Sequence, residues 1–384
     1  MKLSRRGLAK LTAGTGAYAA FIHTNGSAAL ARTNPDFRAV VSITLSGGSD
    51  GWSMIAPTDD RYDSYQRGRG RTLAIPRDAL IALQGEHFGL HPALASLKPI
   101  WENGNLNVVL NTGALIAPLT KPTFRRRPDL RPAGAMMHTE GEAYWRGNVA
   151  IDRWTEPTSA TRDSLFGDLT ENTEHQQKTN NAPITARIAD KYFGADAPLQ
   201  SSLKVQMRRA ALKIADLHAQ GRQRAAFNVP QLGYDTHADQ ADLNDPTQGT
   251  LANLFRELGE ALSAFQGMMT ELGLAENVTT FTRSEFGRAF SLNDEAGTDH
   301  GWGNNHIVIG GAVRPRCIHG RYPDMILDGA EDSTGAGCWI PSTSIEEYLA
   351  PIAEWYGVPE KNMAQVFPNL PRWTSGRASK RLFA

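Results

Sequence analysis

Short apolar segments alternate with amphipathic helical segments along most of this chain, and that alternation limits the folds it can adopt. The strand-like segments are rich in β-branched and aromatic residues and span residues 37–45, 107–110, 227–232, 277–282 and 306–310. Apolar residues recur at helical spacing in Leu203–Gly221 and Leu251–Leu272, and a last helix is expected over Ser344–Tyr356. Such alternation predicts an α/β fold with a mostly parallel sheet and helices on both faces.

Other segments are less regular. Helical structure is expected from His91 to about Trp101 and from Ala143 to Trp154. Loops are predicted for Pro57–Tyr65, for the Pro- and Arg-rich stretch Ile116–Gly134, and for the polar stretch Asn172–Pro183.

Composition excludes some partners. The chain has 384 residues, of which 41% are hydrophobic, and its 40 Lys and Arg residues balance 40 Asp and Glu residues. This balance gives no reason to expect nucleic acid or an anionic membrane as a partner. The short basic run Arg125–Arg127, followed by Arg131, is interpreted first as a solvated loop, with anion capture near a site as the alternative.

The N-terminus resembles an export signal. Arg5 and Arg6 precede a weakly apolar stretch that runs to about Ile22, and Ala29-Leu30-Ala31 has the small-residue pattern of a cleavage site. Twin arginines predict a Tat signal peptide over residues 1–31, handling by the Tat translocase, and a periplasmic or secreted single domain over residues 32–384. The apolar stretch is too short for a stable membrane span, although a retained anchor is the alternative.

The chain has two cysteines, Cys317 and Cys338, which are too far apart in sequence for a CxxC metal motif. In an oxidising compartment they could pair, and two buried free thiols are the other interpretation.

Carboxylates and imidazoles follow the predicted strands closely. Ligands in an open α/β sheet bind outside the carboxyl ends of the strands, and mixed oxygen and nitrogen donors suit Zn²⁺ or Mn²⁺, with Ca²⁺ and Mg²⁺ as further candidates. Two such ions could support an in-line displacement at phosphorus or sulfur. The candidate metal ligands are Asp50, Asp235, His237, Glu285, Asp299, His300 and His306.

Each candidate also has a structural explanation. Asp50 lies in a Gly-rich turn, where aspartate often bonds its own backbone. Glu285 could stabilise the start of a helix, and His306 begins a strand. Asp235 and His237 would share one face of an extended segment, which suits joint ligation. His138 is a further candidate, and His138, Asp299 and His306 are each expected either as a ligand or as a partner of one.

The ordered phrases SGGSDG, FGLHPAL, YDTHADQ, SEFGR and GTDHGWGNNHIVIGGAV, followed by GRYP, resemble the Tat-exported domain-of-unknown-function family numbered 1501. That family is similar to the alkaline phosphatase, sulfatase and phosphopentomutase superfamily. The resemblance implies an alkaline-phosphatase-like three-layer α/β/α sandwich around a mostly parallel sheet. It also implies metal-binding roles for Asp50, for Asp235 with His237, and for His300.

Two departures from the superfamily pattern bear on catalysis. Ser284-Glu285 stands where the superfamily has an Asp-His pair, which weakens the case for two metals. Met136-Met137-His138-Thr139 stands where relatives have Arg-Ser-His-Phe, so the expected serine nucleophile is absent. Thr139 or Thr120 could attack instead, or a water molecule could act directly. His138 would assist catalysis, and Arg288 or Arg146 would neutralise a bound oxyanion.

The sequence therefore predicts an exported metal-dependent hydrolase of phosphate or sulfate esters, acting on a glycan or a small metabolite. The main alternative is a catalytically degenerate periplasmic protein that binds a metal or ligand. A structural partner without metal is a third, weaker hypothesis.

Overall fold

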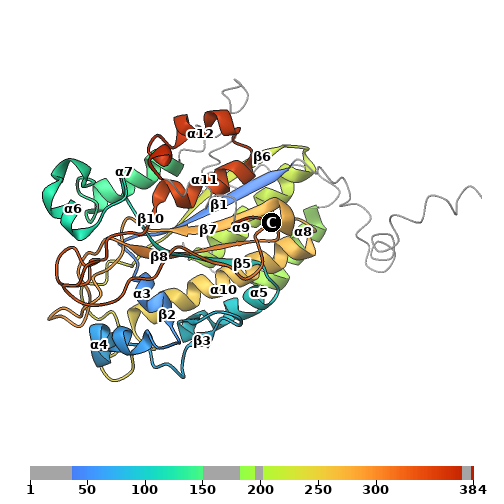
Figure 1. Ribbon diagram of the computed structural model, residues 1–384. Coiled ribbons are helices and arrows are strands. Elements are labelled where there is room, and N and C mark those ends of the chain that lie inside the picture. Colours follow the sequence, from blue (N-terminus) through green and yellow to red (C-terminus); the bar gives the residue numbers. More distant parts are fainter. Residues whose placement is uncertain (1–36, 150–181, 195–201, 374–381) are drawn as a thin grey trace, which may run out of the picture.

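The computed structural model describes residues 37–149, 182–194, 202–373 and 382–384 (Figure 1). Within these residues the main sheet has the order β10-β5-β8-β7-β1-β6, with β9 paired to β5. All pairings are parallel except those of β8, which runs antiparallel to β5 and β7. The strands are β1 (Arg38–Leu45), β5 (Leu106–Gly113), β6 (Arg224–Gln231), β7 (Val278–Arg283), β8 (Asn304–Gly310), β9 (Ile318–His319) and β10 (Thr343–Ser344).

A second, small antiparallel sheet has the order β2-β4-β3 and consists of β2 (Ile55–Pro57), β3 (Ile81–Ala82) and β4 (Phe88–Leu90). The longer helices are α4 (Tyr62–Leu73), α7 (His138–Val149), α8 (Ala182–Phe193), α9 (Leu203–Ala219), α10 (Thr250–Glu271) and α11 (Ile345–Tyr356). Shorter helical segments are α3 (Gly51–Met54), η2 (Pro92–Leu97), α5 (Lys98–Glu102), α6 (Lys121–Arg126), η3 (Pro128–Leu130), η5 (Ala275–Asn277), α12 (Glu360–Val366) and η6 (Leu370–Arg372).

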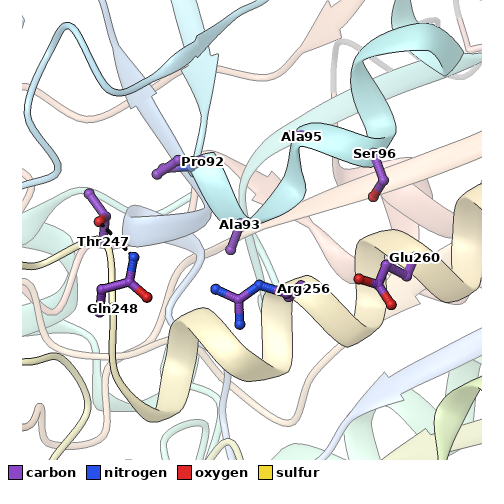
Figure 2. Close-up of a pocket in the computed structure, with 8 residues that line it drawn as sticks. All are labelled: Pro92, Ala93, Ala95, Ser96, Thr247, Gln248, Arg256 and Glu260. Atoms are coloured by element: carbon purple, nitrogen blue, oxygen red, sulfur yellow. Dashed lines mark hydrogen bonds between the residues drawn. The ribbon is translucent and has the colours of Figure 1, made fainter.

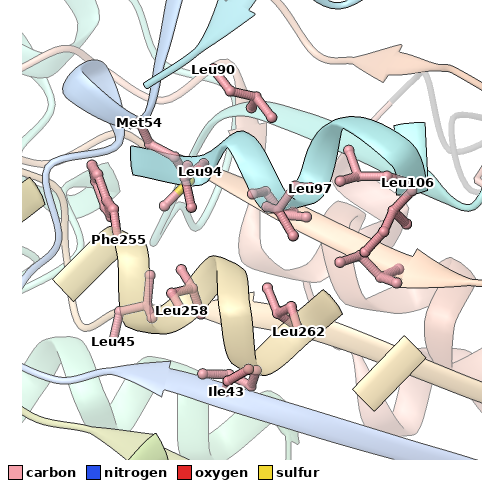
Figure 3. Packing of buried hydrophobic residues seen from close by; sticks show 14 of the residues in the cluster. Ile43, Leu45, Met54, Leu90, Leu94, Leu97, Leu106, Phe255, Leu258 and Leu262 are labelled. Carbon is pink, nitrogen blue, oxygen red and sulfur yellow. The ribbon is translucent and has the colours of Figure 1, made fainter. Parts of the chain in front are cut away.

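Helices cover both faces of the main sheet (Figure 1). Successive residues of β1 point to opposite faces. Val41 and Ile43 pack in one hydrophobic cluster with α9 and α10, and Val40 packs in the other with α11. Figure 3 shows Ile43 of β1 facing Leu258 and Leu262 of α10, in the same cluster as the leucines of η2. The predicted three-layer α/β/α arrangement is confirmed.

Local sequence signals explain the long helices that the periodicity predicted. Ser344 caps α11 with a complete capping box, in which its side chain and that of Glu347 each bond the other residue's backbone. Gly357 ends the same helix with a left-handed φ of 118°. Ser202 caps α9 by accepting a bond from the Val205 N–H.

Several loop predictions were wrong. Helix α4 begins at Tyr62, inside the stretch predicted as a loop. The Pro- and Arg-rich stretch contains α6 and η3, because Thr120 caps α6 and proline is tolerated in the first turn of a helix. Helix α7 begins at His138, five positions before the predicted start at Ala143. The segment from His91 divides into η2 and α5.

Two of the predicted segments lie wholly or mostly outside the described residues. The predicted signal peptide lies outside the described residues, as does most of the predicted loop Asn172–Pro183. Among the helices that the structure describes, none combines the length and apolar character needed to cross a membrane. Cys317 and Cys338 are free thiols; Cys338 is buried, as the second interpretation expects, whereas Cys317 is only partly buried. Burial raises the pKa of Cys338 to about 11.

His306 lies inside β8 and is fully buried. Its ring stacks on Tyr348 of α11 at 5.4 Å between centroids and meets the edge of Trp145 at the same distance. Neither ring nitrogen has a hydrogen-bond partner. Burial lowers the pKa of His306 from 6.5 to about 3, so the ring is neutral in the folded protein. This predicted ligand therefore occupies the core.

The burial of His306 predicts a pH dependence of folding stability. Its folded pKa lies below its unfolded value, so stability is complete above about pH 6.5 and is lost as pH falls toward about 3. The loss is at most about 1.4 kcal/mol per pH unit for this one group. His306→Phe keeps an aromatic ring against Tyr348 and should flatten the dependence between these values.

Urea unfolding at a series of pH values measures this effect. His87→Phe, at an exposed position, controls for the replacement of an imidazole by a phenyl ring. Equal pH dependence in the parent and in His306→Phe would contradict the prediction.

Candidate metal centre

The topology brings three loops to one edge of the main sheet. Strands β1, β6 and β7 are parallel, so their carboxyl ends share that edge. Strand β8 is antiparallel, so the residues that precede it reach the same edge. The loops after Leu45 and Gln231 therefore meet the connection that runs from Arg283 to Asn304.

Three of the converging side chains could hold a metal ion together. One ligand atom each from His138, Asp235 and His300 lies within 4.8 Å of the others. Nε2 of His138 lies 3.5 Å from Oδ2 of Asp235, and Nε2 of His300 lies 3.4 Å from Oδ1. Nε2 of His237 lies 3.2 Å from the same Oδ1. These four residues are called the His–Asp cluster below.

The orientation of His300 fits metal binding. Its Nδ1 lies 2.8 Å from the carbonyl oxygen of Met136, which can only accept a hydrogen bond, so Nδ1 donates. Burial lowers the pKa of His300, with opposition from the Met136 carbonyl, and the neutral ring keeps its lone pair on Nε2. That lone pair faces a carboxylate oxygen of Asp235. A metal ion placed between two such acceptors would offset their repulsion, and a carbonyl behind a histidine is a common support for a metal ligand.

His237 has a similar arrangement. Its Nδ1 lies 3.3 Å from Oδ1 of Asp299, and its Nε2 points to Asp235. Asn293 donates from Nδ2 to Asp299 at 3.2 Å and to the backbone carbonyl of His237 at 2.8 Å. Asp299 therefore lies behind the His237 ring, where its carboxylate can orient that ring.

Arg288 holds Asp235 in position through a hydrogen-bonded ion pair. It is fully buried, and its guanidinium donates to Oδ1 of Asp235. Burial opposes ionisation of Asp235, but the bond to Arg288 and its charge outweigh that effect, so the pKa of Asp235 is lowered. The remaining donors go to the backbone carbonyls of Gly47, Gly48, Tyr234 and Thr298 at 2.6–3.0 Å. This placement leaves no exposed donor for a substrate oxyanion, the role predicted for Arg288.

The structure does not bring Asp50 into the His–Asp cluster. Asp50 is fully buried and caps α3, where it accepts bonds from the backbone N–H groups of Trp52 and Ser53. Its other oxygen accepts from Gln240 at 2.7 Å and pairs with the buried guanidinium of Arg69. This placement agrees with the structural explanation of a Gly-rich turn.

Glu285 is also outside the cluster. Its carboxylate accepts hydrogen bonds from the backbone N–H groups of Gly47 and Gly48 at 2.9–3.1 Å. Both glycines have left-handed φ values, 116° and 83°, which turn the two N–H groups toward one anion. Ser284 accepts from the Ser49 N–H at 2.8 Å. The SEFGR phrase therefore fixes the first loop, and its carboxylate is already hydrogen-bonded.

His138 is the first residue of helix α7. One turn further along, Glu142 forms two bonds of 2.7 and 3.0 Å with Arg283, whose side chain is 4% exposed at the end of β7. The ring of Phe286 lies 4.2 Å from that of His300 and 5.0 Å from that of His138. Sequence periodicity gave no signal for these supports, because the partners lie far apart in the chain.

The other catalytic candidates lie on the surface. Thr139 is exposed in the first turn of α7, next to His138. Thr120 caps α6 and accepts a bond from the Thr123 N–H. Arg146 forms an ion pair with Glu142 at 2.9 Å. None of these placements tests a role in catalysis.

A separate cavity of about 310 Å³ lies between η2 and α10 (Figure 2). Arg256 and Glu260 line it with opposite charges one helical turn apart. No residue of the His–Asp cluster lines this cavity.

Comparison with known proteins gives a family match over part of the chain. No curated protein matches the chain significantly. A family model with the description "Protein of unknown function (DUF1501)" matches residues 148–335, which include Asp235, His237 and His300. This match supports placing the chain in the DUF1501 family of proteins of unknown function.

Proposed function

We propose that this protein is an exported, metal-dependent hydrolase of phosphate or sulfate esters. The observation that supports the metal centre best is the lone pair of His300 Nε2, held 3.4 Å from a carboxylate oxygen of Asp235. His138, Asp235 and His300 would hold the ion, with His237 as a further ligand. Nitrogen and carboxylate donors suit Zn²⁺ or Mn²⁺.

When bound, such an ion supplies Lewis-acid polarisation of an ester oxygen. The chain's own residues then have separate tasks. The Met136 carbonyl and the Asp299 carboxylate orient two imidazole rings, and Arg288 holds Asp235 in place. Thr139 offers a hydroxyl next to His138 as a candidate nucleophile. One ion is favoured over two, because Asp50 and Glu285 are already hydrogen-bonded within the protein.

The cluster is open to solvent, which suits a substrate whose bulk stays outside the protein. The side chains of His138 and Asp235 are 45% and 47% exposed. A glycan or a small metabolite ester could therefore reach them without a deep cavity.

A second candidate function is binding of a metal or ligand without turnover. The observation that favours it is the Glu285 carboxylate on the N–H groups of Gly47 and Gly48. These backbone donors are unavailable to a substrate oxyanion while Glu285 occupies them. The missing serine before His138 points in the same direction.

Removal of one ligand should abolish tight metal binding. We expect His300→Ala to weaken Zn²⁺ binding at least about a hundredfold, because loss of a supporting contact alone typically costs 10- to 100-fold. Titration calorimetry on metal-free protein measures the affinity. His87→Ala, outside the cluster, is the control and should bind Zn²⁺ like the parent. If His300→Ala also binds like the parent, the cluster is not the metal centre.

Turnover distinguishes the two functions. With Zn²⁺ or Mn²⁺ supplied, the parent should hydrolyse aryl phosphate or aryl sulfate esters, and a chelator should stop the reaction. Thr139→Ala should lose activity while its metal affinity is retained if Thr139 is the nucleophile. Tight metal binding without release of the aryl product from any ester would support the second function.

Export depends on the twin arginines in the proposed signal. Arg5→Lys combined with Arg6→Lys should leave the protein in the cytoplasm with its signal uncleaved. Cell fractionation followed by mass measurement checks both outcomes. Normal export and cleavage of this double variant would exclude the Tat route.

A further inference from the structure

The four arginines of the basic segment differ in their partners. Arg127 forms an ion pair with Asp129 at 2.6 Å. Arg131 donates to the backbone carbonyls of Phe124 and Arg125, and its guanidinium lies 4.5 Å from the centre of the Phe124 ring. Within the described part of the chain, the guanidinium groups of Arg125 and Arg126 form neither an ion pair nor a hydrogen bond.

These two unpaired arginines line one cavity. Its volume is about 490 Å³, and Lys121, Pro122, Arg125, Arg126, Asp328, Gly329 and Ala330 form its walls. We call it the basic pocket. None of these residues belongs to the His–Asp cluster, so the two sites are distinct.

Lys121 joins the two walls of the basic pocket. Its side chain is 9% exposed, and Nζ donates to the carboxylate of Asp328 at 2.7 Å. The same ammonium donates to the backbone carbonyls of Asp328 and Gly329 at 2.8 and 3.0 Å. Lys121 is the main partner of the acidic side chain of the pocket. The charge of Arg125 also helps to lower the pKa of Asp328, and with Arg126 the pocket keeps a net positive charge.

The helix that carries the two arginines is fixed to the core. Phe124 of α6 packs on the buried ring of Trp302 at 5.5 Å between centroids. Trp302 in turn donates from Nε1 to the carbonyl of Ala114 at 2.9 Å. Because these contacts hold α6 in place, the backbone that carries Arg125 and Arg126 is already ordered. Binding of an anion therefore costs less conformational entropy.

We propose that the basic pocket binds a phosphate or sulfate group through Arg125 and Arg126. The planar guanidinium presents donors in a fork that matches the spacing of phosphate and sulfate oxygens. The pocket keeps two positive charges next to a space large enough for such a group. This site does not depend on the proposed metal centre.

Titration calorimetry with inorganic phosphate and with phenyl phosphate tests the site. Ionic strength is kept constant, and a chelator is present so that no metal contributes. We expect Arg125→Gln combined with Arg126→Gln to weaken phosphate binding at least about tenfold, because charge-assisted hydrogen bonds are lost. Arg127→Gln is the matched control, since that arginine lies in the same segment but is paired with Asp129.

The outcomes separate clearly. Equal binding by the parent and the double variant, or no binding by the parent, would overturn the proposal. An equal loss in Arg127→Gln would also overturn it, because net charge alone would then explain the effect. Tighter binding of phenyl phosphate than of inorganic phosphate identifies an ester as the ligand, and the reverse order identifies the free ion. Thermal unfolding without phosphate verifies that each variant is folded.

Discussion

One buried guanidinium fixes the loops on which the candidate metal centre depends. Arg288 donates to carbonyls from the loop after β1, the loop after β6 and the segment before β8, and it also holds Asp235. A charged group without exposure is stable only when its donors are satisfied. The loops supply those acceptors, and in return they are held at fixed positions. The geometry of the His–Asp cluster therefore depends on the hydrogen bonds between Arg288 and these loops.

Periodicity was sufficient to predict the framework of the fold. The strands β1 and β7 and the helices α9, α10 and α11 lie within one or two residues of their predicted positions, because burial on one or both faces leaves a repeating pattern. Helices α4 and α6 were missed, because Pro, Gly and Arg masked short helices whose stability comes from tertiary contacts.

The candidate site was predictable only in part. Residue type identified Asp235, His237 and His300, and the turn composition around Asp50 allowed for the structural role that Asp50 has in the fold. Sequence could not distinguish Asp299 as a support, or His306 as a core residue. The position of Asp299 depends on its contact with Nδ1 of the His237 ring. The position of His306 depends on its place as the third residue of β8, inside the sheet. Neither property leaves a local pattern.

The anchoring of α7 has a mechanical consequence. His138 and Glu142 lie one turn apart on the same helix, and Glu142 is bonded to the end of β7. The ring of Trp145 on the same helix is buried against Tyr348 of α11, so α7 is held at two points and keeps the imidazole of His138 beside Asp235. The other two histidines come from loops tied to the sheet. Among these three histidines, His138 is therefore the one whose position depends on how a helix packs against the sheet.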